Sequence, residues 1–271
     1  MKTVSEVLDI SVKFLSDKEV KSPRRLVEEL LSHVLKLPRL EIYMQFDRPL
    51  QEDELGRLRE YVKQAATKMP WQYIVGKVKF MGCIIEVSPD VLIPRQETEI
   101  LGEMIVKEMG DGPTVVWDIC CGSGCLGIGI KKRRPDCTVV LSDVSEKAVA
   151  MARRNGGDDV RQGDLFEPFV GSKADVIVCN PPYVSEAEYA GLEDEVRVWE
   201  PKMALVGEKS GFEFYERLAG EVLGYLHPGG KVYLEIGRGM GSRVREIFSG
   251  CGEVEVMKDF AGHDRFVVVR L

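Results

Sequence analysis

The sequence lacks an excess of basic residues. Its 271 residues include 37 Lys and Arg against 44 Asp and Glu, which gives a formal net charge of −7. A protein that grips duplex DNA by its phosphates needs a basic face. Direct DNA binding is therefore not expected, although small basic clusters such as Lys131–Arg134 leave local contacts open.

Long apolar runs are also missing. No segment approaches the roughly 20 apolar residues of a membrane-spanning helix. The first residues lead into amphipathic sequence instead of the apolar core of a signal peptide. We therefore expect a cytoplasmic protein without a membrane partner.

Histidine is scarce, and the cysteines follow no paired spacing. The chain has three histidines, seven scattered cysteines and no Cys-x-x-Cys pair. Structural zinc sites use paired ligands, so no metal is expected. The odd number and irregular spacing of the cysteines argue against a disulfide framework, and we expect small buried thiols in a reducing compartment.

The first 94 residues change character once. Residues 1–69 carry apolar side chains at helical spacing, and Ser22-Pro23 is typical of a helix N-cap followed by Pro in the first turn. From Trp71 to Val87, apolar runs are split by Gly76 and Met81-Gly82, which predicts a short β-hairpin. We expect a helical domain over 1–69 and a β-hairpin linker over 70–94.

Residues 95–271 alternate strand and helix patterns, which predicts an α/β fold with a mostly parallel sheet covered on both faces. The final apolar runs, Val254–Met257 and Phe266–Val269, are joined by a connection too short for a crossover helix, so the last strand should be antiparallel. The expected strands are Thr114–Ile119, Cys137–Ser142, a short strand before Asp164, Ala174–Cys179, Lys231–Ile236 and the two final runs; the expected helices are Cys125–Arg133, Glu146–Arg154 and Phe212–Leu226.

A glycine-rich turn follows the first of these strands. Gly122-Ser-Gly124-Cys-Leu-Gly127 matches the dinucleotide fingerprint, and Asp143 stands about twenty residues later, where a carboxylate accepts from ribose hydroxyls. The match is weak on its own. It leaves open a nicotinamide-dependent dehydrogenase, a non-catalytic nucleotide-binding module and a simple Gly-rich turn.

Asn180-Pro181-Pro182-Tyr183 ends the strand Ala174–Cys179. The two prolines carry no N–H and restrict the backbone, so the strand stops there and the turn is nearly rigid. Asn180 offers an amide acceptor and donors, and Tyr183 offers a ring and a hydroxyl. A strand-ending turn with a surface tyrosine is the plain alternative.

Three features accompany the glycine-rich turn: Asp118 before it, Asp164-Leu165 after the short third strand, and Asn180–Tyr183. With these features the chain resembles class I S-adenosylmethionine-dependent methyltransferases, which have a Rossmann-like, seven-stranded sheet. The resemblance implies S-adenosyl-L-methionine as cofactor, S-adenosyl-L-homocysteine as product and no metal. It assigns the cofactor to Cys120, Cys121, Gly122, Ser123, Gly124, Asp143, Asp164, Leu165 and Asn180. A helix N-cap for Asp143 and a turn role for Asp164 remain open.

The tetrapeptide is shared by enzymes that methylate planar nitrogens, whose lone pair is delocalised as in a peptide bond. The Asn180 side-chain oxygen and the Pro181 carbonyl can hold the two hydrogens of such a nitrogen. Tyr183 can pack against the plane of the substrate or against the sulfonium. This assigns Asn180, Pro181 and Tyr183 to catalysis, and these three with Pro182 to substrate binding.

Further motifs are spread over nearly the whole length of the chain. They are Ser22–Arg24, Pro70–Tyr73, Gly76, Phe80–Gly82, Val91–Glu99, Asn180–Tyr183, Trp199–Pro201, Ala204-Leu205, Gly211, Phe214-Tyr215, Pro228–Gly230, Glu235–Gly237 and Asp259–Arg265. Through these residues the chain resembles the release-factor glutamine methyltransferases of the HemK/PrmC family. The resemblance implies methylation of the glutamine side-chain amide in the Gly-Gly-Gln motif of class 1 peptide-chain release factors, which act in translation termination. It also implies that the helical domain binds the release factor.

Two positions depart from the family pattern. Gln96 stands where proline is usual, and Cys120 stands at the first glycine of the cofactor loop, where a side chain restricts φ. Pro94–Glu99 either covers the methionine end of the cofactor or begins a helix. Two related activities also stay open: glutamine methylation of a ribosomal protein, and adenine N6-methylation of nucleic acid, which the acidic balance disfavours.

Overall fold

The computed structural model describes residues 2–271, which divide into two compact units. Unit 1 runs up to Gly76 and includes Asp194–Trp199; unit 2 comprises Lys77–Glu193 and Glu200–Leu271. The segment Asp194–Trp199 joins unit 1 through an ion pair between Lys68 and Asp194, and through a hydrogen bond from Trp199 Nε1 to the Thr67 carbonyl.

Unit 1 is a helical bundle, as the sequence predicts. Apolar faces of its helices meet in one core that contains Leu8, Val27, Leu30 and Leu58. Its elements are α1 (Val4–Ser16), α2 (Pro23–Leu35), the 3₁₀ helix η1 (Arg39–Gln45), α3 (Glu52–Ala65), α4 (Trp71–Val75) and α9 (Asp194–Trp199).

The prediction that the Ser22 side chain caps α2 is wrong. Pro23 does open α2, but Ser22 adopts φ +46° and ψ +49°, and its side chain makes no capping hydrogen bond. A side-chain cap needs an extended backbone at the N-cap residue, and the left-handed conformation of Ser22 does not provide it. Thr3 does cap α1, through a reciprocal capping box with Glu6.

The predicted hairpin is confirmed over β1 (Lys77–Phe80) and β2 (Cys83–Glu86), which pair antiparallel. It is wrong over residues 71–76, because Trp71–Val75 forms the helical turn α4. Gly76 at φ +77° ends this turn and donates its N–H to the Gln72 carbonyl. That left-handed position suits glycine and separates helix from strand.

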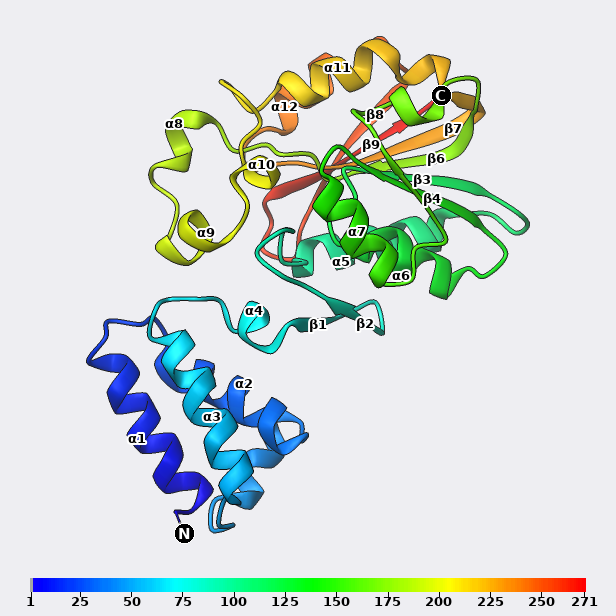
Figure 1. The fold of residues 1–271 in the computed structure, drawn as a ribbon. Coiled ribbons are helices and arrows are strands. Elements are labelled where there is room, and N and C mark those ends of the chain that lie inside the picture. Colours follow the sequence, from blue (N-terminus) through cyan, green and yellow to red (C-terminus); the bar gives the residue numbers. More distant parts are fainter. Residues whose placement is uncertain (1) are drawn as a thin grey trace. The chain divides into compact units, whose positions relative to one another are not determined.

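Unit 2 contains a seven-stranded sheet in the order β5-β4-β3-β6-β7-β9-β8, drawn in Figure 1. β9 runs antiparallel to both β7 and β8, which confirms the mostly parallel sheet with an antiparallel last strand. The strands are β3 (Val115–Ile119), β4 (Thr138–Asp143), β5 (Asp159–Gln162), β6 (Ala174–Cys179), β7 (Leu226–Glu235), β8 (Glu253–Lys258) and β9 (Asp264–Arg270).

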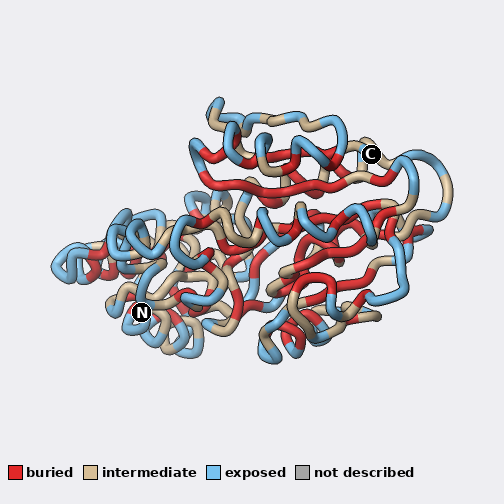
Figure 2. Tube along the Cα trace, turned by 90° about the horizontal axis from the view of Figure 1, so that it is seen from above, coloured by how far each residue is buried: buried red, intermediate tan, exposed pale blue. Residues whose placement is uncertain are grey.

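Helices cover both faces of this sheet: α5, α6 and α7 lie on one side, and α11 and α12 on the other (Figure 1). The strands β3, β6 and β9 consist largely of buried residues, and Figure 2 colours such buried stretches red. Trp117 of β3 stacks on Phe169 within the core. The helices are α5 (Gln96–Glu108), α6 (Cys125–Arg133), α7 (Glu146–Arg154), η2 (Glu167–Phe169), α8 (Glu186–Tyr189), α10 (Lys202–Leu205), α11 (Glu213–Glu221), η3 (Val222–Gly224) and α12 (Gly241–Ile247).

All seven cysteines are free thiols. Within residues 2–271, no helix has the length and apolar character that crossing a bilayer requires.

Candidate active site

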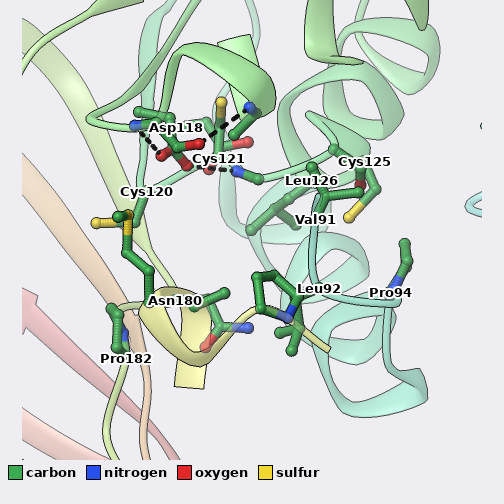
Figure 3. A pocket seen from close by; sticks show the side chains of 18 of the residues that line it. Val91, Leu92, Pro94, Asp118, Cys120, Cys121, Cys125, Leu126, Asn180 and Pro182 are labelled. Carbon is green, nitrogen blue, oxygen red and sulfur yellow. Dashed lines mark hydrogen bonds between the residues drawn. The ribbon is translucent and has the colours of Figure 1, made fainter. Parts of the chain in front are cut away.

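The carboxyl ends of β3, β4 and β6 meet at one edge of the sheet, because these strands are parallel neighbours. The loops that leave this edge enclose a pocket (Figure 3). Asp118 and Cys120 come from the end of β3, Asp143 ends β4, and Asn180 follows β6. Ligands of open α/β sheets bind at such an edge.

Seven of the residues predicted for the site line this pocket. They are Cys120, Cys121, Gly122, Ser123, Asp143, Asn180 and Pro182. Asn180 and Pro182 lie at one end, away from Asp118 of β3 and from Cys121 in the turn that follows it (Figure 3). Val91, Leu92 and Pro94 form a further wall.

The other five predicted residues do not line the pocket: Gly124, Asp164, Leu165, Pro181 and Tyr183. Gly124 caps α6 at φ +76°, and Leu165 is buried in the core. Asp164 pairs with Arg217 at 2.5 Å. Burial raises the pKa of Tyr183 to about 12, so its hydroxyl stays protonated near neutral pH. The proposed contacts of these residues stay predictions.

The glycine-rich turn is held by hydrogen bonds to β4. Cys121 N–H donates to the Ser142 carbonyl, and Gly122 N–H donates to Asp143 Oδ2, both at 2.9 Å. Cys120 adopts φ +59°, a left-handed conformation that costs a residue with a Cβ roughly 1–2 kcal/mol. Its side chain lines the pocket, and the turn forms with cysteine at this position.

The Asp143 carboxylate accepts hydrogen bonds from two loops. Its Oδ2 accepts from Gly122, and its Oδ1 accepts from Ser145 N–H at 2.9 Å. Ser145, not Asp143, is the N-cap of α7, since its hydroxyl accepts from Ala148 N–H. Burial raises the pKa of Asp143 above its ordinary value.

Asp118 is a second buried carboxylate in the same pocket. Its Oδ2 accepts from Gly127 N–H at 2.9 Å, and burial, followed by the nearby Asp143, raises its pKa to about 7. No Lys, Arg or His nitrogen of residues 2–271 lies within 4 Å of either carboxylate. A pocket with two uncompensated carboxylates between apolar walls favours a cationic ligand.

Sequence reasoning missed three side chains that support the site. Thr98 and Glu235 form hydrogen bonds that lead to Asn180, and Glu200 holds the wall beside them. Each is a polar residue in an otherwise apolar setting, and their nearness arises from contacts across 82 to 137 residues. Periodicity carries no signal for such contacts.

Glu200 connects two walls of the pocket. Its Oε2 accepts from Ile93 N–H at 3.1 Å, and its Oε1 accepts from the Arg95 guanidinium. Arg95 and Pro94 line the pocket on one side of this carboxylate, and Pro201 on the other. The segment Pro94–Glu99 begins α5 at Gln96, which confirms the helix start, and it also lines the pocket through Pro94, Arg95 and Thr98. That it covers the methionine end of the cofactor stays a prediction.

The strand order, the antiparallel last strand and the pocket at the carboxyl edge define the Rossmann-like methyltransferase class. A methyltransferase structure from Pyrococcus furiosus shares this fold, with a TM-score of 0.51 and 22% identity, over 81% of this chain and 98% of that one. Residues 96–195 match the family described as methyltransferase small domain, and residues 6–76 match the PrmC N-terminal domain.

Curated relatives narrow the class. A release factor glutamine methyltransferase from Chlamydia trachomatis serovar L2 is 40% identical over 97% of this chain and 92% of its own length. One from Geobacter sulfurreducens is 38% identical over 99% and 97%. The chain belongs to the release factor glutamine methyltransferase family, as the resemblance predicted.

Proposed function

We propose that this protein transfers a methyl group from S-adenosyl-L-methionine to the side-chain amide nitrogen of the glutamine in the Gly-Gly-Gln motif of class 1 release factors. Family membership supports the reaction. The observation that carries it is the Asn180 amide at the end of the pocket, whose Nδ2 is engaged by Thr98 at 3.3 Å. Its Oδ1 is thereby available to accept a hydrogen bond from a substrate.

The target nitrogen is a poor nucleophile, because its lone pair is delocalised into the carbonyl. Asn180 Oδ1 and the Pro181 carbonyl hold its two hydrogens and turn its electron density toward the methyl group. Holding the reactants in line contributes about 7–11 kcal/mol, more than the ~3–4 kcal/mol of one aimed hydrogen bond. Positioning is therefore the main contribution of this chain, and Tyr183 packs against the substrate plane.

The pocket residues suit this cofactor. When bound, S-adenosyl-L-methionine supplies an electrophilic methyl group on a positively charged sulfur. Asp118 and Asp143 offer the negative charge that such a cation needs, and Asp143 stands where a carboxylate accepts from ribose hydroxyls. Apolar side chains from Val91, Leu126 and Phe214 offer surface for a flat base. Asp164 and Leu165 are assigned to adenine on the family resemblance.

We assign the helical domain, residues 1–69, to binding of the release factor, with residues 70–94 as linker and 95–271 as the methyltransferase domain. A glutamine loop alone offers little surface, and specific interfaces bury about 800 Å² on each partner. The reaction takes place in the cytoplasm and involves neither DNA nor a membrane.

Incubation with purified release factor and labelled S-adenosyl-L-methionine tests the proposal. We expect label on the Gly-Gly-Gln glutamine, and none on a release factor with that glutamine changed to alanine. Label that persists on the alanine variant contradicts the proposed target. Parallel reactions with ribosomal protein and with DNA or RNA test the two related activities.

A further inference from the structure

Three polar side chains of unit 2 form a hydrogen-bonded series that ends at Asn180. Asn180 Nδ2 donates to Thr98 Oγ1 at 3.3 Å, and Thr98 Oγ1 donates to Glu235 Oε2 at 2.7 Å. Asn180 follows β6, Thr98 lies in the first turn of α5, and Glu235 ends β7. The series therefore connects the pocket with the interior of the domain.

Glu235 is the unusual member of this series. Its side chain is 1% exposed, and Thr98 is 4% exposed. Within residues 2–271, no Lys, Arg or His nitrogen lies within 4 Å of the Glu235 carboxylate. Burying an unpaired carboxylate costs free energy, so packing alone does not account for a glutamate here.

The series has a fixed direction while Glu235 is ionised. A carboxylate only accepts hydrogen bonds, and a threonine hydroxyl has one hydrogen to give. Because Thr98 gives its hydrogen to Glu235, the Thr98 oxygen can only accept from Asn180. The Asn180 amide must then turn Nδ2 toward Thr98, which leaves Oδ1 for the pocket.

We propose that Glu235 and Thr98 are positioning residues, which hold the Asn180 amide with Oδ1 directed at the substrate nitrogen. The identity of that nitrogen rests on the function proposed above. An Asn180 amide turned by half a rotation presents its NH₂ group to the NH₂ group of the glutamine. Donors then face donors, and the methyl acceptor is no longer held.

Charged groups from three neighbouring segments face Glu235. Arg265 of β9 and Arg95 before α5 favour its ionised form, and Glu97 of α5 opposes it. Both arginines have other partners: Arg265 donates to the Ile236 carbonyl at 3.1 Å, and Arg95 pairs with Glu200. Neither replaces Thr98 as the hydrogen-bond donor to the carboxylate.

The remaining titratable neighbours are neutral around pH 7. Tyr215 of α11 donates its hydroxyl to the Glu235 main-chain carbonyl at 2.8 Å. Burial raises the pKa values of Tyr183, of Tyr215 and of Cys125 in α6 above their ordinary values. Within the hydrogen-bonded series, Glu235 is the group that changes charge near neutral pH.

Burial raises the pKa of Glu235 to about 7. Below that pH, the protonated carboxyl can donate to Thr98, whose hydrogen is then free for Asn180 Oδ1. We therefore expect kcat to fall as the pH falls through about 7, and E235Q to remove this acid limb. Asp118, whose pKa is also raised to about 7, lies at the cofactor loop, so its protonation should change the KM for the cofactor.

The test compares T98V, which loses the hydroxyl at nearly constant shape, with T98S, which keeps it. T138V is the matched control, because Thr138 is exposed at the start of β4. We expect T98V to lower kcat about a hundredfold, the cost of misplacing a reacting group. Its KM for the cofactor and its thermal stabilisation by S-adenosylhomocysteine should match wild type, and T98S and T138V should retain most activity.

A T98V enzyme with wild-type kcat overturns the inference while the function stands. So does a T98V enzyme that loses S-adenosylhomocysteine binding along with turnover, or a T98S enzyme as impaired as T98V, because either result assigns Thr98 a general structural role.

A second measurement does not depend on the methyl acceptor. The side-chain amide signals of Asn180, identified by their loss in N180A, should shift with pH around 7 in wild type and stay constant in E235Q. Wild-type enzyme that fails to label release factor contradicts the proposed function, while these signals still test the inference. Signals that ignore pH in wild type contradict the inference itself.

Discussion

At the scale of residues, the site combines carboxylates that lack cationic partners with an amide held in one orientation. Asp118 and Asp143 line the same pocket, and Glu235 is linked to Asn180 through Thr98. Burial raises the pKa of each of these three carboxyl groups. Shifted pKa values of this kind are concentrated at functional sites, where a charged group binds a ligand or orients a neighbouring side chain.

Asn180→Ala separates binding from transfer. The variant should bind S-adenosylhomocysteine almost as wild type does, because the carboxylates and the turn that form the pocket are unchanged. Turnover should fall by about 10²–10³-fold, the loss that follows removal of one aimed hydrogen-bonding group. Thermal shift and single-turnover labelling measure the two effects, and near-normal turnover removes Asn180 from its assigned role.

The titration of the buried carboxylates should also appear in stability. The pKa values of Asp118 and Glu235 are raised to about 7 in the folded chain, so the native state binds more protons than the unfolded state below that pH. Their stabilising contribution is present below their ordinary pKa values and is lost as the pH rises through about 7.

We therefore expect the free energy of unfolding of the ligand-free protein to decrease from about pH 5 to about pH 7, by up to about 1.4 kcal/mol per pH unit for each group, and to level off above about pH 8. Denaturant titrations of wild type and E235Q measure this slope. A slope in E235Q equal to that of wild type contradicts the assignment to Glu235.

At the scale of elements, the Asn180–Tyr183 turn packs against a later loop, which contains Val206, Gly207 and Gly211. Val184 pairs with Val206 in an isolated bridge, and Gly207 N–H donates to the Val184 carbonyl at 2.9 Å. A Cβ on Gly211 would lie 2.2 Å from the Tyr183 carbonyl oxygen, and Gly211 has φ +82°. The turn and this loop therefore fit only with glycine at position 211.

Gly211→Ala should destabilise the protein by about 1–3 kcal/mol or more, because the new methyl group meets backbone that cannot move aside cheaply. Turnover should fall with it, since Tyr183 is displaced. Gly220→Ala is the control, as its Cβ meets nothing within 4 Å on α11. Chemical denaturation and labelling of both variants check this, and a G211A protein as stable and active as G220A refutes it.

Elements with a strong local pattern were predictable, and those set by distant contacts were not. The apolar runs that alternate with helical patterns predicted the seven strands. The short connection between the last two runs predicted the antiparallel β9. The turn α4 was missed because five residues carry too little periodicity to separate helix from strand. Thr98, Glu200 and Glu235 were missed because their roles arise only when segments far apart in the sequence meet.

Those site residues that lie at the carboxyl ends of strands could be predicted from the sequence. Asp143 and Asn180 lie at the carboxyl edge because β4 and β6 are parallel neighbours of β3. The orientation of the Asn180 amide depends on Thr98, which no strand-end rule includes. The family resemblance predicted the reaction. The hydrogen bonds that orient the Asn180 amide could be identified only in the folded chain.

At the scale of the whole molecule, the helical domain carries two large apolar side chains that are exposed. Leu40 and Met44 of η1 are exposed by 76% and 74%, in a domain that already has its own apolar core. Exposed apolar side chains near one another are typical of interaction surfaces. We place these two residues in the proposed release-factor contact.

Replacing Leu40 and Met44 by serine should raise the KM for full-length release factor about thirtyfold or more, since truncated interface anchors cost about 1 kcal/mol or more each. The kcat and S-adenosylhomocysteine binding should not change. Exposed Val170, in unit 2, supplies the control as Val170→Ser. Steady-state kinetics on the release factor measure the effect, and an unchanged KM removes η1 from the contact.

The central claim is tested most directly by mass spectrometry of the tryptic Gly-Gly-Gln peptide from release factor that has been incubated with this enzyme and S-adenosyl-L-methionine. We predict a mass increase of one methyl group for one hydrogen, placed by fragmentation on the glutamine side chain, and about 10²–10³-fold less of this product at early times with N180A. An unmodified glutamine after incubation with active wild-type enzyme, or a methyl group on another residue, would contradict the account.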